Sequence, residues 1–251
     1  MIATVKRVLT AIGLKPLARK LIPPTAKALA TLKRSRTVTR NGVRYRLDLH
    51  ECIDSSIFMT GEWEADTCRF LRATVKSGDT VIEVGANIGA HTLLLGKLCA
   101  PGHVFAFEPT DYACAKLRAN LALNPDIQNV TLIQAAVTNH EHAIPNKHIT
   151  CSWPLFGGSG EETVNVEALA LDEFPFDRIS LFKVDVDGYD FKVLEGASNI
   201  LRRFRPVVFV ELCEYRLNEV GDSITKIRAL MRDLDYQLDR MFGQNAVFRP
   251  S

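Results

Sequence analysis

Short apolar runs alternate with amphipathic stretches along most of the chain. The runs at 80–84, 104–107, 129–134, 163–168, 179–186, 206–212, 236–238 and 246–248 have the length and composition of strands. Apolar positions at helical spacing predict helices over 61–75, 91–98, 112–123 and 223–234, with another beginning near Tyr189. Strands that alternate with helices in this way predict an α/β fold with a doubly wound, mostly parallel sheet.

Two further elements are expected ahead of this fold. Asn41-Gly42 is a tight-turn signal, and apolar side chains at 43, 45, 47 and 49 alternate with polar ones, so 37–50 is predicted to form a β-hairpin. Residues 1–36 carry apolar positions at helical spacing, interrupted at Pro23-Pro24. We therefore divide the chain into a helical amphipathic arm, 1–36, and a catalytic domain, 37–251.

The net charge of +2 conceals a strong asymmetry. Residues 1–47 contain twelve basic residues and no acid, which leaves 19 of the 31 basic residues against all 29 acidic ones in the remainder. A basic amphipathic arm suits peripheral contact with an anionic membrane surface, and it suits packing against the chain's own acidic domain equally well. The sequence leaves both interpretations open.

Length and composition indicate one catalytic domain. A chain of 251 residues, 47% hydrophobic and 24% charged, can bury a sizeable core, and none of its apolar runs approaches the ~20 residues of a membrane span. Its six cysteines are scattered without a C-x-x-C pair, which is typical of reduced thiols. We expect a cytoplasmic protein with no bound metal.

The most informative stretch joins the first strand to the next helix: Glu83-Val84-Gly85-Ala86-Asn87-Ile88-Gly89. Open α/β sheets bind ligands at such strand ends. Asn87 replaces the middle glycine of a dinucleotide motif, and the Glu83 carboxylate would repel a pyrophosphate. Both features favour a cationic ligand such as S-adenosylmethionine, and Glu108, at the end of the second strand, can accept hydrogen bonds from its ribose hydroxyls.

Three motifs, in this order, resemble those of the FkbM family of S-adenosylmethionine-dependent methyltransferases: 83–89, Ala106-Phe107-Glu108-Pro109, and Lys183-Val184-Asp185-Val186-Asp187-Gly188. The likeness runs from about 43 to 248. It implies a Rossmann-like class I methyltransferase that uses S-adenosylmethionine and methylates a hydroxyl of a sugar, glycolipid or secondary metabolite. The chain has Glu83 where the family usually has Asp, and Asp187 and Asp190 where it usually has Glu.

The motifs assign residues to the cofactor. The positions expected to contact it are Glu83, Gly85, Ala86, Asn87, Gly89, Glu108, Pro109 and Ala136.

Catalytic candidates cluster in the third motif. Asp185 and Asp187 share one face of an extended segment by the period of two, and we assign the catalytic role to them, with Asp185 as the base or the group that orients the acceptor. Asp190 suits a helix's first turn, and Glu211, at the end of the following strand, is a further candidate. Nearby acids could hold a divalent ion, but no ligand spacing singles one out, and His91 is expected to pack.

Other functions remain as alternatives. A nicotinamide-dependent oxidoreductase would share the turn and Glu108, and a methyltransferase could act on another acceptor class such as nucleic acid. No basic patch interleaved with aromatic residues supports nucleic-acid binding, so we expect a small-molecule or glycan acceptor and no nucleic-acid partner. The glycine-rich loop 154–160 is predicted to be either a substrate lid or a plain connection.

Overall fold

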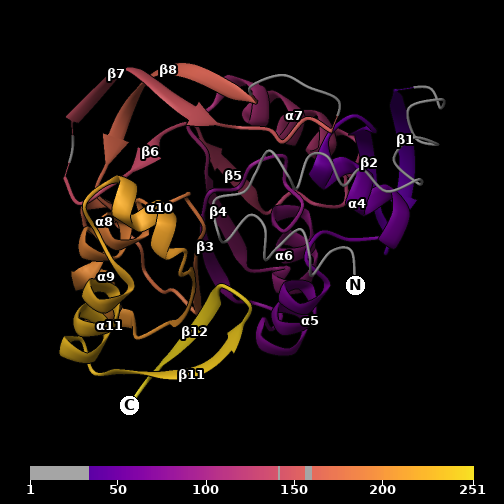
Figure 1. The fold of residues 1–251 in the computed structure, drawn as a ribbon. Coiled ribbons are helices and arrows are strands. Elements are labelled where there is room, and N and C mark those ends of the chain that lie inside the picture. Colours follow the sequence, from indigo (N-terminus) through magenta and orange to yellow (C-terminus); the bar gives the residue numbers. More distant parts are fainter. Residues whose placement is uncertain (1–33, 141, 156–159) are drawn as a thin grey trace.

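A computed structural model describes residues 34–140, 142–155 and 160–251 (Figure 1). The predicted arm, apart from its last three residues, and the glycines at 157 and 158 lie outside the described residues. Within the described ranges, no helix combines the length and the apolar character needed to cross a membrane. All six cysteines are free thiols, and Cys68, Cys99, Cys114 and Cys151 are buried.

The centre of the molecule is a seven-stranded sheet with the order β11-β12-β10-β9-β3-β4-β5. Its strands are β3 (Thr80–Val84), β4 (His103–Phe107), β5 (Val130–Ile133), β9 (Leu181–Val184), β10 (Val207–Glu211), β11 (Tyr236–Phe242) and β12 (Asn245–Pro250). Five adjacent strands of this sheet are mutually parallel: β10, β9, β3, β4 and β5. The strand β12 runs antiparallel to both of its neighbours. The predicted doubly wound, mostly parallel sheet is confirmed.

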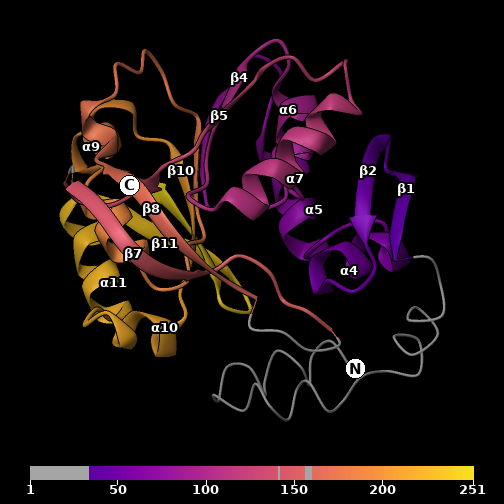
Figure 2. The same cartoon turned by 90° about the horizontal axis from the view of Figure 1, so that it is seen from above.

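Helices cover both faces of this sheet (Figures 1 and 2). One side carries α5 (Ala65–Thr74), α6 (Thr92–Cys99) and α7 (Asp111–Ala122); the other carries α8 (Asp190–Glu195), α9 (Ser198–Phe204) and α11 (Ile224–Asp233), with the short α10 (Glu214–Glu219) between β10 and α11. Alternate strand residues face alternate layers. Val81 and Leu181 pack with Leu71 and Leu95, whereas Ile82 and Phe182 belong to the core beneath the second layer.

The predicted hairpin is present as β1 (Ser35–Arg40) and β2 (Val43–Asp48), beginning two residues earlier than expected. Its apolar face packs with Ile88, Leu93 and Ile127 in a third core cluster. Two buried asparagines, one in α7 and one just after it, also hold the β2 backbone, because the amides of Arg44 and Arg46 donate to the side-chain oxygens of Asn124 and Asn120 at 2.9 and 2.8 Å. The hairpin is therefore fixed to the sheet's helical layer.

A second, three-stranded sheet has the order β6-β8-β7 and lies above the main sheet in Figure 1. It comprises β6 (Ala136–Val137), β7 (His142–Thr150) and β8 (Glu161–Leu169), and a 3-10 turn (Leu171–Glu173) follows. The sequence pattern predicted β8 but not β7. The turn's Asp172 accepts from the amides of Asn199 and Ile200 at 2.9 and 2.8 Å, so it caps α9.

Two predicted elements need correction. The helix expected from 61 begins only at Ala65, because an unpredicted helix, α4 (Cys52–Thr60), ends at Gly61 in a left-handed conformation. The strand expected over 179–186 ends at Val184, so the period of two does not extend through Asp187. Asp187 instead has a left-handed backbone, with φ of 53°.

Candidate functional site

The strand order reverses between β3 and β9, and this switch point places the glycine turn beside the third motif. Gly85 follows β3 with φ of 87°, a conformation that L side chains rarely adopt. A Cβ atom at this position would lie 1.9 Å from the carbonyl oxygen of Asp185. Glycine is required here because the two strand ends approach each other through their backbones.

The turn after Gly85 is held by short local hydrogen bonds. The amides of Gly85 and Ala86 both donate to the Phe107 carbonyl, at 3.0 and 3.1 Å. Asn87 takes a left-handed φ of 47°, and its Oδ1 accepts from the Ile88 amide at 2.8 Å. Asn87 therefore supplies the positive φ that its position requires, together with a side-chain cap that glycine could not provide.

Glu108 connects this turn to the next strand–helix junction. Its Oε2 accepts from the Asn87 amide at 2.9 Å, and its Oε1 accepts from the amide and hydroxyl of Thr110 at 3.1 and 2.6 Å. Burial raises the pKa of the Glu108 carboxyl, and these three hydrogen bonds oppose the rise. A carboxylate has about four acceptor sites, so one remains on Oε2 for an incoming hydroxyl.

The first amides of α7 are capped from the second sheet. Thr110 stands at the N-cap position of this helix, but its hydroxyl donates to Glu108 instead. The amides of Asp111 and Tyr112 donate to the carboxylate of Glu162, at 2.8 and 3.0 Å. This contact attaches β8 to the strand end beside Glu108.

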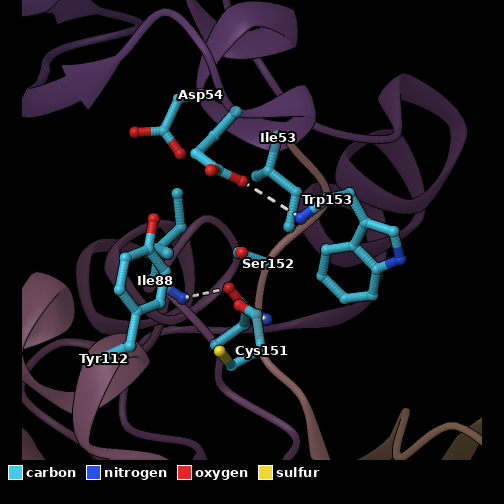
Figure 3. Close-up of a pocket in the computed structure, with 9 residues that line it drawn as sticks. Ile53, Asp54, Ile88, Tyr112, Cys151, Ser152 and Trp153 are labelled. Carbon is cyan, nitrogen blue, oxygen red and sulfur yellow. Dashed lines mark hydrogen bonds between the residues drawn. The ribbon is translucent and has the colours of Figure 1, made fainter. Parts of the chain in front are cut away.

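A small hollow lies on the α4 and α7 side of the glycine turn. Figure 3 shows Tyr112 and Trp153 on opposite sides of it, with Cys151 and Ser152 between them. The Cys151 carbonyl accepts from Asn87 Nδ2 at 3.4 Å, and the Trp153 amide donates to Glu51 at 3.0 Å. The segment after β7 is thus attached both to the glycine turn and to the start of α4, and the third motif does not line this hollow.

Glu83 is buried and does not face the open edge of the sheet. Its Oε2 accepts from the Thr92 hydroxyl at 2.6 Å, and its Oε1 lies 3.5 Å from Nζ of Lys183, its register partner in β9. The same ammonium lies 3.5 Å from Oδ2 of Asp185. Burial alone would lower the pKa of Lys183, but the Asp185 and Glu83 carboxylates outweigh it and raise that pKa, so Lys183 is a buried cation shared between two acids.

The two expected catalytic aspartates have different partners. The Asp185 side chain is 32% exposed and contacts Lys183, whereas Asp187 lies 3.4 Å from Nε of Arg216 and is 38% exposed. Asp190 is buried at the start of α8, and it accepts from the amides of Val186 and Gly188 at 3.3 and 3.0 Å. Burial, reinforced by the charge of Asp185, raises the pKa of Asp190 to about 7.

Glu211 completes this group of acids from the neighbouring strand. Val210 pairs with Val184 in the parallel register, so Glu211 and Asp185 are the next residues of adjacent strands. Burial raises the pKa of Glu211 well above its ordinary value, and the charges of Asp185, Asp190, Asp187 and Glu64 add to the rise. We call Asp185, Asp187, Asp190 and Glu211 the carboxylate edge.

The remaining predicted residues have structural contacts. His91 is buried, and its Nε2 lies 3.3 Å from the Trp63 carbonyl; burial and then Lys183 lower its pKa to about 3, so it stays neutral as the packing prediction requires. Ala136 lies in β6, paired with Ala168. The cofactor roles of all eight positions named from the sequence, Ala136, Pro109, Gly89 and Glu83 among them, stay predictions. Within the described ranges, no group of three or more His, Cys, Asp or Glu residues is arranged to hold a metal ion.

Four side chains that shape the site were not predicted: Thr92, Glu162, Arg216, and Lys183 as the partner of Glu83. Only Lys183 carried a signal, because a lysine inside an apolar strand needs buried acidic partners. Thr92, Glu162 and Arg216 contact residues that are 9 to 51 positions away in the sequence. No local sequence pattern connects such positions.

Strand order, switch point and glycine turn together define a Rossmann-like class I methyltransferase fold. A family match agrees: the Methyltransferase FkbM domain matches residues 83–238. The chain belongs to this family. The match includes the glycine turn, Glu108 and the carboxylate edge, and it decides between the two enzyme classes considered above in favour of a methyltransferase.

Individual relatives are distant. Methyltransferase sdnD of Sordaria araneosa is 23% identical over 203 residues, covering 62% of this chain and 78% of that protein. Hexuronic acid methyltransferase AglP of Haloferax volcanii is 24% identical over 188 residues, covering 70% and 77%. The crystal structure of Methyltransferase FkbM from Methylobacillus flagellatus KT shares the fold with a TM-score of 0.51 at 13% identity; it aligns with 72% of this chain, which spans half of that one.

Proposed function

We propose that this protein transfers a methyl group from S-adenosylmethionine to a hydroxyl of a sugar, glycolipid or secondary metabolite. The observation that carries the proposal is the convergence of two sets of groups at one switch point. The glycine turn and Glu108 lie at the ends of β3 and β4, and Asp185 lies at the end of β9, where its backbone meets the turn and its side chain is partly exposed. Ligands of open α/β sheets bind at such a position.

The residues present fit this cofactor. Glu108 retains one acceptor site for a ribose hydroxyl, and the carboxylate edge supplies negative charge where a sulfonium and an ammonium group would be stabilised. When bound, S-adenosylmethionine supplies a methyl group on a positively charged sulfur. The chain's own residues would hold acceptor and methyl carbon in line at about 3 Å, which by itself provides much of the acceleration.

A hydroxyl acceptor also has a proton to lose, and the carboxylate edge offers a base. Asp185 is our candidate for this step or for orienting the hydroxyl, since its backbone meets Gly85 and its side chain is partly exposed. The Haloferax relative is named as a hexuronic acid methyltransferase, which supports a sugar acceptor.

The test has a binding part and a transfer part. Titration calorimetry should detect binding of S-adenosylmethionine and no comparable binding of NAD. Purified protein with methyl-labelled S-adenosylmethionine is then offered free hexuronic acids, glycolipid extracts, secondary-metabolite alcohols and RNA. Label in a methyl ether of one of the hydroxyl compounds would support the proposal. Label only in RNA, or on nitrogen or carbon, would contradict it.

A further inference from the structure

The two acids that end neighbouring strands at the carboxylate edge have unlike surroundings. Asp185 has the Lys183 ammonium 3.5 Å from its Oδ2. Among the residues that the structure describes, none donates a hydrogen bond to the Glu211 carboxyl. The side chain opposite Glu211 in β12, Asn245, donates to Glu64 and Thr67 instead. Asp185 therefore has a cation beside it, whereas within the described ranges Glu211 has neither a cation nor a hydrogen-bond donor as a partner.

The acidic groups around Glu211 all raise the pKa of its carboxyl. Asp185 follows β9, Asp187 lies in the turn before α8, Asp190 begins α8 and Glu64 precedes α5, and the charge of each raises the pKa of Glu211. The nearby cations already have partners, because Lys183 lies between Glu83 and Asp185, and Arg216 lies between Asp187 and Glu219. The thiol of Cys213 is a neighbour as well, and burial raises its pKa.

Unlike environments for two adjacent acids usually mark different roles, one ionised group that binds or orients and one that exchanges a proton near neutral pH. We propose that Glu211 accepts the proton of the acceptor hydroxyl, while Asp185, whose carboxylate lies beside the Lys183 ammonium, orients that hydroxyl. The inference rests on the proposed function and assigns the proton within it.

The step balances as follows. A lone pair of the acceptor oxygen forms the new bond to the methyl carbon, and the carbon–sulfur bond breaks with its electron pair left on sulfur. The hydroxyl proton moves to an oxygen of Glu211, which thereby becomes neutral. The positive charge of the sulfonium and the negative charge of Glu211 are both cancelled, so no net charge is created at the edge.

This assignment predicts proton release on cofactor binding, before any acceptor is present. Burial and the surrounding acids raise the pKa of Glu211 in the free protein, so this carboxyl holds its proton more tightly than an ordinary glutamate. A sulfonium placed against the edge favours the charged form and expels the proton. S-adenosylhomocysteine, whose sulfur is neutral, lacks this driving force, and the two ligands are otherwise alike.

The experiment is titration calorimetry at pH 7 in phosphate and in Tris, whose ionisation enthalpies differ, so that the difference in observed heat gives the number of protons released. We expect release with S-adenosylmethionine, much less with S-adenosylhomocysteine, and none in Glu211→Gln. Asp233→Asn, a change at a side chain that is 68% exposed, should release protons like the wild type.

Asp190 needs its own variant because it also titrates near pH 7. Release that persists in Glu211→Gln but disappears in Asp190→Asn would overturn the assignment, as would equal release with both ligands. If the wild type binds S-adenosylmethionine without releasing protons, the assignment of Glu211 is overturned but the proposed function is not. If the wild type does not bind S-adenosylmethionine, the proposed function itself is overturned. A Glu211→Gln variant that still binds it also shows that the variant is folded.

With a methyl acceptor identified, the same variant separates a base from a structural residue. Glu211→Gln should lower the maximal rate by about 10²-fold or more and remove the acid limb of the pH–rate profile, with little change in cofactor affinity. Glu211→Asp should recover part of the rate, because it restores a carboxylate at shorter reach. A wild-type rate and profile in Glu211→Gln would overturn the proposal.

Discussion

The two halves of the switch point are built differently. At the ends of β3 and β4, polar groups are satisfied by short local contacts: Asn87 caps the turn, and Glu108 accepts three hydrogen bonds from the protein. At the ends of β9 and β10, acids outnumber cations, and the nearest cation, Lys183, is shared at 3.5 Å with each of two carboxylates. The half at β3 and β4, which we call the rigid half, has its polar groups hydrogen-bonded within the protein. The half at β9 and β10, the charged half, carries excess negative charge.

This difference separates two tasks. Binding a nucleoside requires a fixed backbone and one well-oriented acceptor, which local hydrogen bonds provide at little cost. Transferring a proton requires groups whose charge can change, and the closely spaced acids of the carboxylate edge oppose one another's ionisation. Proteins keep such an arrangement where function requires it, since electrostatic repulsion there lowers stability.

The largest expected effect comes from the contact that joins the two halves. Gly85→Ala places a Cβ atom 1.9 Å from the Asp185 carbonyl oxygen and also forces alanine into a positive φ. The conformational penalty and the overlap with backbone together should destabilise the protein by about 3 kcal/mol or more. Urea unfolding monitored by circular dichroism measures it.

Gly78→Ala is the matched control. Gly78 has nearly the same φ, 85°, but nothing lies within 4 Å of its added Cβ. Only the conformational penalty of about 1–2 kcal/mol applies there. Equal losses in the two variants would show that the strand ends do not approach as closely as described.

The rigid half was largely predictable from the sequence, and the charged half was predictable only in part. Gly85, Asn87 and Glu108 belong to motifs whose residues act on their neighbours in sequence or at strand ends. The contact between Lys183 and Glu83 depends on the register of β3 with β9, about 100 residues apart. No sequence period contains that information.

The missed elements have similar causes. β7, His142–Thr150, contains a proline and no regular alternation, and it is defined by pairing with β8. The first turn of α4 has no side-chain cap, so its start carries no N-cap signal. The α7 cap comes from Glu162, 51 residues away. In each case a partner distant in sequence determines the structure.

The next effect tests the charged half. Asp185→Asn keeps the size of the side chain but removes its negative charge and proton acceptance. We expect the maximal methylation rate to fall by about 10²-fold or more, with a stable fold and a modest change in cofactor affinity. Asp187→Asn makes the same chemical change at a residue paired with Arg216 and should cost less. A greater loss in Asp187→Asn would transfer the role to that residue.

A smaller effect tests the rigid half. Glu108→Ala removes the acceptor for a ribose hydroxyl, and a charge-assisted hydrogen bond of this kind contributes roughly 1.5–3 kcal/mol. S-adenosylmethionine should bind at least about tenfold more weakly by calorimetry. S-adenosylhomocysteine carries the same ribose and should lose as much, so a loss confined to S-adenosylmethionine would place Glu108 near the sulfur instead. Unchanged affinity for both ligands would remove the residue from the site.

The smallest effect is a pH dependence of stability that comes from the charged half. The pKa of Asp190 is about 7 in the folded protein and near 3.8 in the unfolded chain, so the folded state holds this proton more tightly. Stability from this group is therefore greatest in acid, falls as the pH rises through about 7, and changes little above that. Between pH 6 and 8 the wild type should lose about 1 kcal/mol more than Asp190→Asn, which cannot ionise. If the urea unfolding midpoints of the two proteins change equally with pH across this range, Asp190 ionises normally. The carboxylate edge would then be better neutralised than its contacts indicate.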